Sequence, residues 1–159
     1  MSEIRRATKE DDRACAEIVR QLPDYFTDDV PATVVADLSE HLAWVTVDAG
    51  EVVAFVVVQR RSARSAEILW LAVRPADRGS GIGTALVEHV IAQLTADGLA
   101  LLEVKTLDRS AGYAPYLATA DFWERRGFVQ IDTIDPLPGW PSGNPAAIHV
   151  AALAPTRSA

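Results

Sequence analysis

The sequence has only one cysteine and no long apolar run. Cys15 has no partner for an internal disulfide, which is typical of proteins that fold in a reducing compartment. No stretch approaches the ~20 apolar residues of a membrane-spanning helix. The start of the chain, MSEIRRATKEDD, is polar and charged, unlike a signal peptide. We therefore expect a cytoplasmic protein without a membrane partner, with Cys15 in its core.

The sequence also lacks an excess of basic residues. Its 15 lysines and arginines are outnumbered by 22 acidic residues, and its formal net charge is −7. Nonspecific nucleic-acid binding depends on neutralising phosphates, so we expect no nucleic-acid partner. The acidity is compatible with attraction of a cationic substrate, and equally with simple solubility. The three histidines and Cys15 do not have the spacing of metal ligands, so we expect no metal.

Strand and helix patterns alternate along a chain whose length suits one domain, residues 1–159. β-branched runs on both sides of Asp48-Ala49-Gly50 predict a hairpin. The sequence therefore predicts a single-domain mixed α/β fold with about seven strands and about four helices. The strands are expected at 3–7, on both sides of the turn within 42–61, and at 66–73, 100–107, 128–134 and 146–153; the helices are expected at 9–22, 32–41, 82–94 and 116–126.

Three glycines, Gly79, Gly81 and Gly83, separate a predicted strand from a predicted helix. A helix N-terminus has unpaired N–H groups, and glycines allow a ligand to approach them, so this junction predicts an anion site. A nucleotide triphosphatase loop is excluded because the last glycine is not followed by Lys and then Ser or Thr. A dinucleotide fingerprint is excluded because no glycine stands at its sixth position.

The pattern RGSGIG, Arg78-x-x-Gly81-x-Gly83, resembles the acetyl-CoA loop of the GNAT acetyltransferase superfamily. The resemblance extends to LAVRP before the loop and to FWERRGF, residues 122–128, after it. It implies that acetyl-CoA is a co-substrate and lies between two splayed parallel strands, 66–73 and 100–107. The cofactor-binding residues that it implies are Leu71, Ala72 and Val73 along the pantetheine arm, Arg78, Gly79, Ser80, Gly81, Ile82, Gly83 and Thr84 around the pyrophosphate, and Trp123 of the closing helix.

Acetyl transfer to an amine requires a base for the amine and an acid for the thiolate leaving group. Glu67 is the base candidate, because relatives have glutamate at the matching position, and Glu103 on the opposite strand is its rival. Many relatives have a tyrosine near the sulfur where this chain has Trp123, whose indole N–H has no useful acidity. Tyr116 or Tyr113 is then the candidate acid, unless water protonates the thiolate.

The acceptor is expected where loop 23–29 meets the late loop 136–145. Tyr25, Phe26 and Trp140 are candidates for an aromatic wall, and the acidic residues of the first loop for attracting an ammonium group or for simple solvation. The favoured function is an N-acetyltransferase that acts on a small amine. The alternatives are an acetyltransferase acting on a protein amine and a non-catalytic acyl-CoA sensor. The resemblance also implies a possible homodimer.

Overall fold

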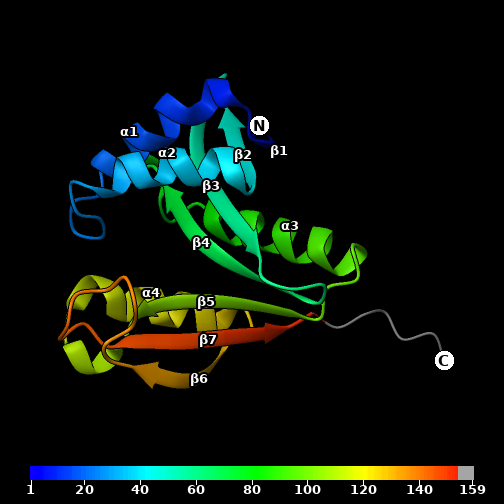
Figure 1. Ribbon diagram of the computed structural model, residues 1–159. Helices are drawn as coiled ribbons and strands as arrows, with labels where there is room; N and C mark the ends of the chain where they lie inside the picture. The colour runs from blue at the N-terminus through cyan, green and yellow to red at the C-terminus, as the bar shows by residue number, and fades with distance from the viewer. Residues whose placement is uncertain (154–159) are drawn as a thin grey trace.

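A computed structural model describes residues 1–153 as one seven-stranded sheet with the strand order β1-β2-β3-β4-β5-β7-β6 (Figure 1). Neighbouring strands are antiparallel, except that β4 and β5 run parallel. The strands are β1 (Glu3–Arg6), β2 (Leu42–Asp48), β3 (Glu51–Arg60), β4 (Ser65–Val73), β5 (Leu101–Leu107), β6 (Val129–Ile134) and β7 (Ala146–Ala152). The predicted mixed sheet is confirmed.

Four α-helices cover the sheet: α1 (Asp12–Arg20), α2 (Val30–Glu40), α3 (Ile82–Ala96) and α4 (Ala114–Arg125). In Figure 1, α1 and α2 lie over β2–β4, while α3 and α4 lie behind the strands. One core cluster joins α1 and α2 to β2–β4, and a second joins α3 and α4 to β2–β5. Burial of one large apolar side chain stabilises the fold by about 1.5–3 kcal/mol, so these two clusters hold the helices on the sheet.

The start of α1 shows why the chain turns where it does. The backbone N–H of Thr8 donates to Asp11 Oδ2 at 2.7 Å. Arg5 donates to both oxygens of the same carboxylate, at 2.8 and 2.9 Å. Asp11 is only 5% exposed, and the hydrogen bond from Arg5 is the main reason that its pKa lies below the usual range. This carboxylate therefore fixes the exit from β1 into the first helix.

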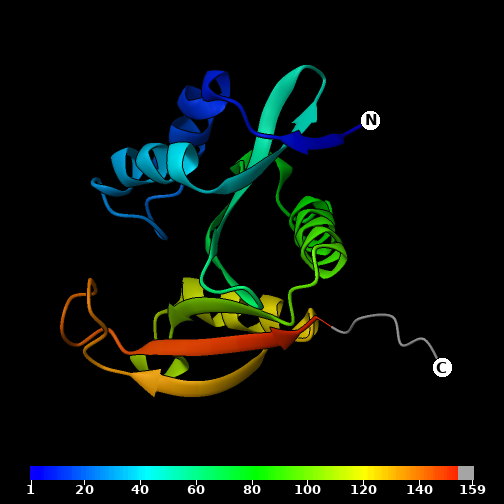
Figure 2. The same ribbon diagram turned by 45° about the vertical axis from the view of Figure 1, so that its right-hand side comes forward.

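The parallel pair β4–β5 is short and then opens. It runs from Ser65 opposite Leu101 to Ile68 opposite Val104. Beyond that point β4 stays paired with β3, and β5 stays paired with β7, so the two strands diverge. Figure 2 shows β4 rising steeply away from β5. The predicted splayed parallel strands are confirmed.

No helix within residues 1–153 is both long enough and apolar enough to cross a membrane. All seven strands belong to one sheet. Residues 154–159 of the predicted domain 1–159 lie outside the described residues.

Candidate functional site

The loop between β4 and α3 forms a helix N-terminus with free donors. Gly81 caps α3 with a φ of 85°, in the left-handed region that favours glycine. The first hydrogen bond into the helix runs from the N–H of Ala85 to the carbonyl of Gly81, at 3.0 Å. The N–H groups of the three residues between them therefore have no carbonyl of their own helix to bind. These donors and the positive end of the helix dipole fit an anion.

The predicted loop residues lie at the surface around this helix start. Arg78, Gly79, Ser80 and Gly81 are exposed, and Ile82, Gly83 and Thr84 are partly buried. A Cβ atom placed on Gly83 would lie 3.5 Å from Val73 and 3.6 Å from the ring of Phe122, which is ordinary van der Waals contact. Alanine would therefore fit at Gly83, whereas a side chain at Gly81 meets an unfavourable backbone angle. Leu71 and Val73 on β4 are partly buried, and Ala72 is buried.

Arg78 connects the loop to the segment between α1 and α2. Its Nη2 donates to the hydroxyl of Tyr25 at 3.1 Å, and its Cζ lies 4.8 Å from the centre of the Tyr25 ring. Tyr25 also packs edge-on against Tyr116 of α4, with ring centres 5.5 Å apart. Tyr25 therefore touches both α4 and the loop between β4 and α3, residues 74–81, which we call the anion loop.

Glu67 is a buried carboxylate close to the point where β4 and β5 diverge. It is 5% exposed and lies directly opposite Glu103. Lys105 Nζ lies 3.3 Å from Glu67 Oε1 and 3.5 Å from Glu103 Oε1. Arg61 Nη1 lies 3.7 Å from the same Glu67 oxygen. Burial raises the pKa of Glu67, and the positive charge of Lys105 opposes that rise.

The strand register explains this cluster. Ala66 and Ile68 pack into the core with α3 and α4, so the intervening Glu67 points to the opposite face of the sheet. Glu103 and Lys105 alternate in the same way with the buried residues of β5. The sequence analysis missed Arg61 and Lys105. The period of two along β5 could have placed Lys105 beside Glu103.

The two candidate tyrosines hydrogen-bond to the loop between α1 and α2. The hydroxyl of Tyr113 donates to the carbonyl of Asp24 at 2.6 Å, and that of Tyr116 donates to the carbonyl of Tyr25 at 2.7 Å. Burial raises the pKa of Tyr116 to about 12. Each hydroxyl therefore has a backbone partner, and Tyr116 stays protonated at neutral pH.

Trp123 lies in the core beneath these residues. It is 4% exposed, and its ring centre is 5.1 Å from those of Phe122 and Phe128. Both contacts are edge-on, an arrangement that aromatic pairs prefer. The large indole therefore joins α4 to the start of β6 by apolar packing.

The three residues predicted for an aromatic wall lie in two loops. Phe26 packs edge-on against Trp70 of β4 at 6.1 Å, next to Tyr25. The Trp70 indole donates to Asp37 Oδ2 at 2.7 Å. Trp140 is partly buried in the loop between β6 and β7, where its backbone N–H donates to the carbonyl of Leu137 at 2.9 Å. Both loops lie at the same end of the molecule, on opposite sides of the divergent strands.

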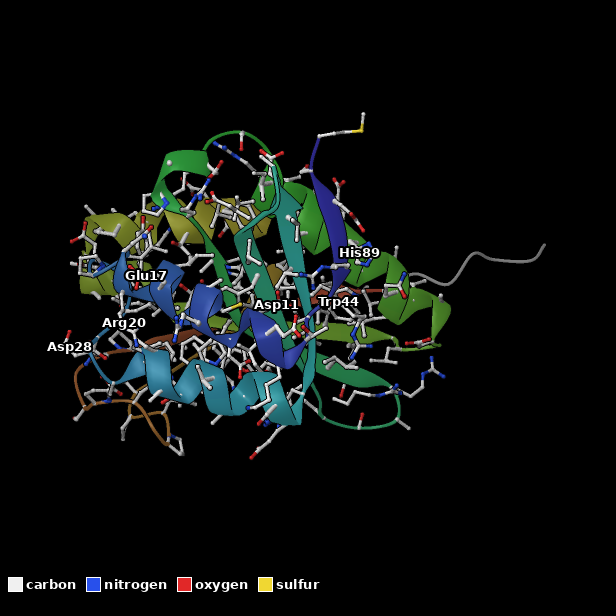
Figure 3. All side chains as sticks on the ribbon, turned by 90° about the horizontal axis from the view of Figure 1, so that it is seen from above. Asp11, Glu17, Arg20, Asp28, Trp44 and His89 are labelled. Atoms are coloured by element: carbon white, nitrogen blue, oxygen red, sulfur yellow. The ribbon has the colours of Figure 1, made fainter. Side chains whose placement is uncertain are left out.

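Two further features contain none of the predicted site residues. Asp37, Glu40 and His41, near the end of α2, bring ligand-type atoms within 4.8 Å of one another, which the sequence analysis did not anticipate. A cavity of about 340 Å³ lies between β1, β2 and α3 and is lined partly by Trp44 and His89. Figure 3 shows Trp44 and His89 close together, far from Asp28 in the loop between α1 and α2. None of the predicted site residues lines this cavity.

Comparisons with known proteins agree with this architecture. A family model for the acetyltransferase (GNAT) domain matches residues 39–130, which is more than half of the chain. No match was found among curated proteins. A GNAT-family protein from Desulfovibrio desulfuricans has a similar structure, with 20% identity, a TM-score of 0.84, and coverage of 97% of this chain and 100% of that one.

Two enzymes with different acceptors have the same fold. The ribosomal-protein-S18-alanine N-acetyltransferase of Escherichia coli is 22% identical, with a TM-score of 0.81 and coverage of 99% of this chain and 97% of its own. An aminoglycoside 6′-N-acetyltransferase in complex with coenzyme A is 18% identical, with a TM-score of 0.74 and coverage of 98% and 99%. Similarity at these identities shows the fold and leaves the acceptor open.

Proposed function

The chain belongs to the GNAT acetyltransferase family, and from this premise we propose that it transfers the acetyl group of acetyl-CoA directly to a primary amine of a small molecule. The observation that carries the proposal is the buried Glu67, placed where β4 and β5 diverge. A carboxylate whose pKa is raised by burial is suited to accept a proton near neutral pH.

The chain's own residues fit acetyl-CoA. The free N–H groups at the start of α3 and the left-handed Gly81 suit a pyrophosphate. The stretch of β4 that has no strand partner on its β5 side, including Leu71 and Val73, leaves room for the pantetheine arm. Acetyl-CoA supplies the thioester, whose carbonyl carbon is attacked by the amine.

The proton steps follow from these positions. The amine nitrogen forms a bond to the carbonyl carbon, and its proton passes to Glu67, directly or through water. The carbon–sulfur bond then breaks, and the thiolate takes up one proton. We assign this second proton to water, because the Tyr116 hydroxyl already donates to a backbone carbonyl and a pKa of about 12 makes it a weak acid. Glu103 remains the rival base, since it shares the contact with Lys105.

The first experiment is an assay of thiol release. Purified protein is mixed with acetyl-CoA and pooled amines, including amino acids, polyamines, aminoglycosides and short peptides, and free CoA is followed with a thiol reagent. Cys15 is fully buried and burial raises its pKa to about 12, so the folded protein should give little background. Amine-dependent release that Glu67→Gln abolishes is the expected result. Release with peptides alone would favour the protein-amine alternative.

A second candidate function is an acyl-CoA sensor without catalysis. Two observations favour it: Trp123 is packed in the core, and the Tyr116 hydroxyl is occupied by a loop carbonyl. A sensor would bind acetyl-CoA but release no thiol with any amine. Calorimetry on the same samples shows whether acetyl-CoA binds, and thiol release from samples that bind it then separates the two functions. Glu67→Gln should leave cofactor binding unchanged in both.

A further inference from the structure

Arg126, at the end of α4, is a partly buried cation at the start of α3. Its Nη2 donates to the hydroxyl of Thr84, and its Nη1 donates to the carbonyl of Phe122 at 3.1 Å. Its Cζ lies 4.4 Å from the centre of the Phe122 ring. Its Nε is buried and has no hydrogen-bond partner among the described residues. The two hydrogen bonds hold the side chain in place and use one N–H of each terminal nitrogen, so each terminal nitrogen keeps a second N–H for a ligand.

Arg126 differs from the other partly buried arginines. Arg5 is paired with Asp11, and Arg74 is paired with Glu51 and Asp77. Within residues 1–153, Arg126 has no carboxylate within 4.0 Å, although the chain carries 22 acidic residues. Removing a cation from water without a counter-charge is unfavourable. This position therefore fits an anion that comes from outside the chain.

The neighbourhood of Arg126 identifies the anion. Thr84 is the third residue of α3, and its backbone N–H is one of the free donors at the start of that helix. The ring of Phe122 that supports Arg126 also faces Gly83. Arg78 lies in the anion loop, three residues before Gly81, and it too has no carboxylate partner within the described residues. The free N–H groups of α3 therefore include that of Thr84, whose hydroxyl Arg126 contacts, and they follow closely after Arg78 in the chain.

We propose that Arg126 binds a phosphate group of the CoA cofactor, together with Arg78 of the loop before α3. This inference rests on the proposed cofactor site. CoA carries a pyrophosphate and a 3′-phosphate, and both are anions that a guanidinium recognises with charge-assisted hydrogen bonds. The anion supplies the counter-charge that the folded chain does not give to Arg126.

Isothermal titration calorimetry with CoA and with dephospho-CoA tests this assignment. Arg126→Gln is compared with Arg125→Gln, which removes the same charge from the neighbouring, exposed position of α4. Loss of a charge-assisted hydrogen bond should weaken CoA binding by about 10- to 100-fold in Arg126→Gln, while Arg125→Gln stays within about twofold. Arg126→Lys, which keeps the charge, should recover part of the loss.

The two ligands identify the phosphate group. Equal weakening for CoA and dephospho-CoA assigns Arg126 to the pyrophosphate, and weakening for CoA alone assigns it to the 3′-phosphate. If Arg126→Gln does not fold, Arg126→Leu, which can pack on Phe122, replaces it. CoA binding by the Arg126 variant within twofold of Arg125→Gln would overturn the inference. Failure of the unaltered protein to bind CoA would instead overturn the cofactor site itself.

Discussion

The Lys105→Met substitution should move the acidic limb of the pH dependence of kcat/KM to higher pH. Burial raises the pKa of Glu67, and Lys105 lowers it. Removing the ammonium group, which lies 3.3 Å from Glu67 Oε1, should therefore raise the pKa of Glu67 further. The base is active only when ionised, so a higher pKa makes the enzyme lose activity at a higher pH.

The magnitude follows from the separation of the charges. Two unit charges 3.3 Å apart interact by about 5 kcal/mol at an effective dielectric constant of about 20. That value is an upper limit, because Lys105 is 23% exposed and Arg61 remains 3.7 Å from the carboxylate. An opposite charge at this range shifts a carboxyl pKa by about 1–3 units, and we take the lower end. The expected result is a roughly tenfold lower kcat/KM on the acidic limb, with an unchanged plateau at higher pH.

The assay is thiol release at low amine concentration across the pH range, with acetyl-CoA saturating. Glu103→Gln is the matched control on the same strand, because the negative charge of Glu103 raises the pKa of Glu67. Its acidic limb should therefore move in the opposite direction, to lower pH. Lys105→Arg should keep the limb near its original position. Because the ionisations of Glu67 and Glu103 are coupled, the acidic limb reports the titration of the pair and not that of one carboxyl group alone.

Two outcomes would refute this reasoning. A uniform loss of activity at every pH would mean that Lys105 acts on folding or on acceptor binding, and not through Glu67. If Lys105→Met and Glu103→Gln lose activity at the same acidic pH, neither charge influences the titrating group. Glu67 would then be rejected as the base.

Three other perturbations have defined outcomes. Gly81→Val forces a β-branched residue to a φ of 85°, so it should cost at least about 1–2 kcal/mol in unfolding experiments and weaken CoA binding, whereas Gly83→Ala should do neither. Asp11→Asn should cost about 1–3 kcal/mol in urea unfolding at pH 7. Since the pKa of Asp11 is lowered from 3.8, that difference should be full above pH 4 and disappear as the pH falls through the folded-state pKa; a constant difference at all pH values would contradict the ionic role. Tyr116→Phe should lower thiol release by less than about fivefold, through loss of the bond to Tyr25, and a loss above about 100-fold would show that the hydroxyl transfers a proton.

The sequence predicted the order of strands and helices because the local signals are strong. The Asp48-Ala49-Gly50 turn has positive φ at its last two residues, as a tight hairpin requires. Gly81 and Gly98, both with positive φ, stand at the start and just after the end of α3. Such signals depend on neighbouring residues alone, so a single sequence is enough to read them.

The contacts of the site depend on pairs that are distant in sequence. Lys105 meets Glu67 across a separation of 38 residues, and Arg126 meets Thr84 across 42. The strand period places Lys105 on the face of Glu103, but only the register of β4 against β5 brings it to Glu67. The partner of the Tyr116 hydroxyl is likewise a carbonyl 91 residues away. No local pattern encodes such a partner.

The position of Tyr25 makes the loop between α1 and α2 part of both proposed binding sites. Its ring covers the Arg78 guanidinium, and its carbonyl accepts the Tyr116 hydroxyl. A phosphate that binds Arg78 competes for the same guanidinium donors that now reach the Tyr25 hydroxyl. Two ligands that draw on one contact influence each other's affinity by the same factor. An acceptor that binds this loop is therefore expected to change the affinity for the cofactor through Tyr25, and titrating CoA with and without the acceptor measures that change.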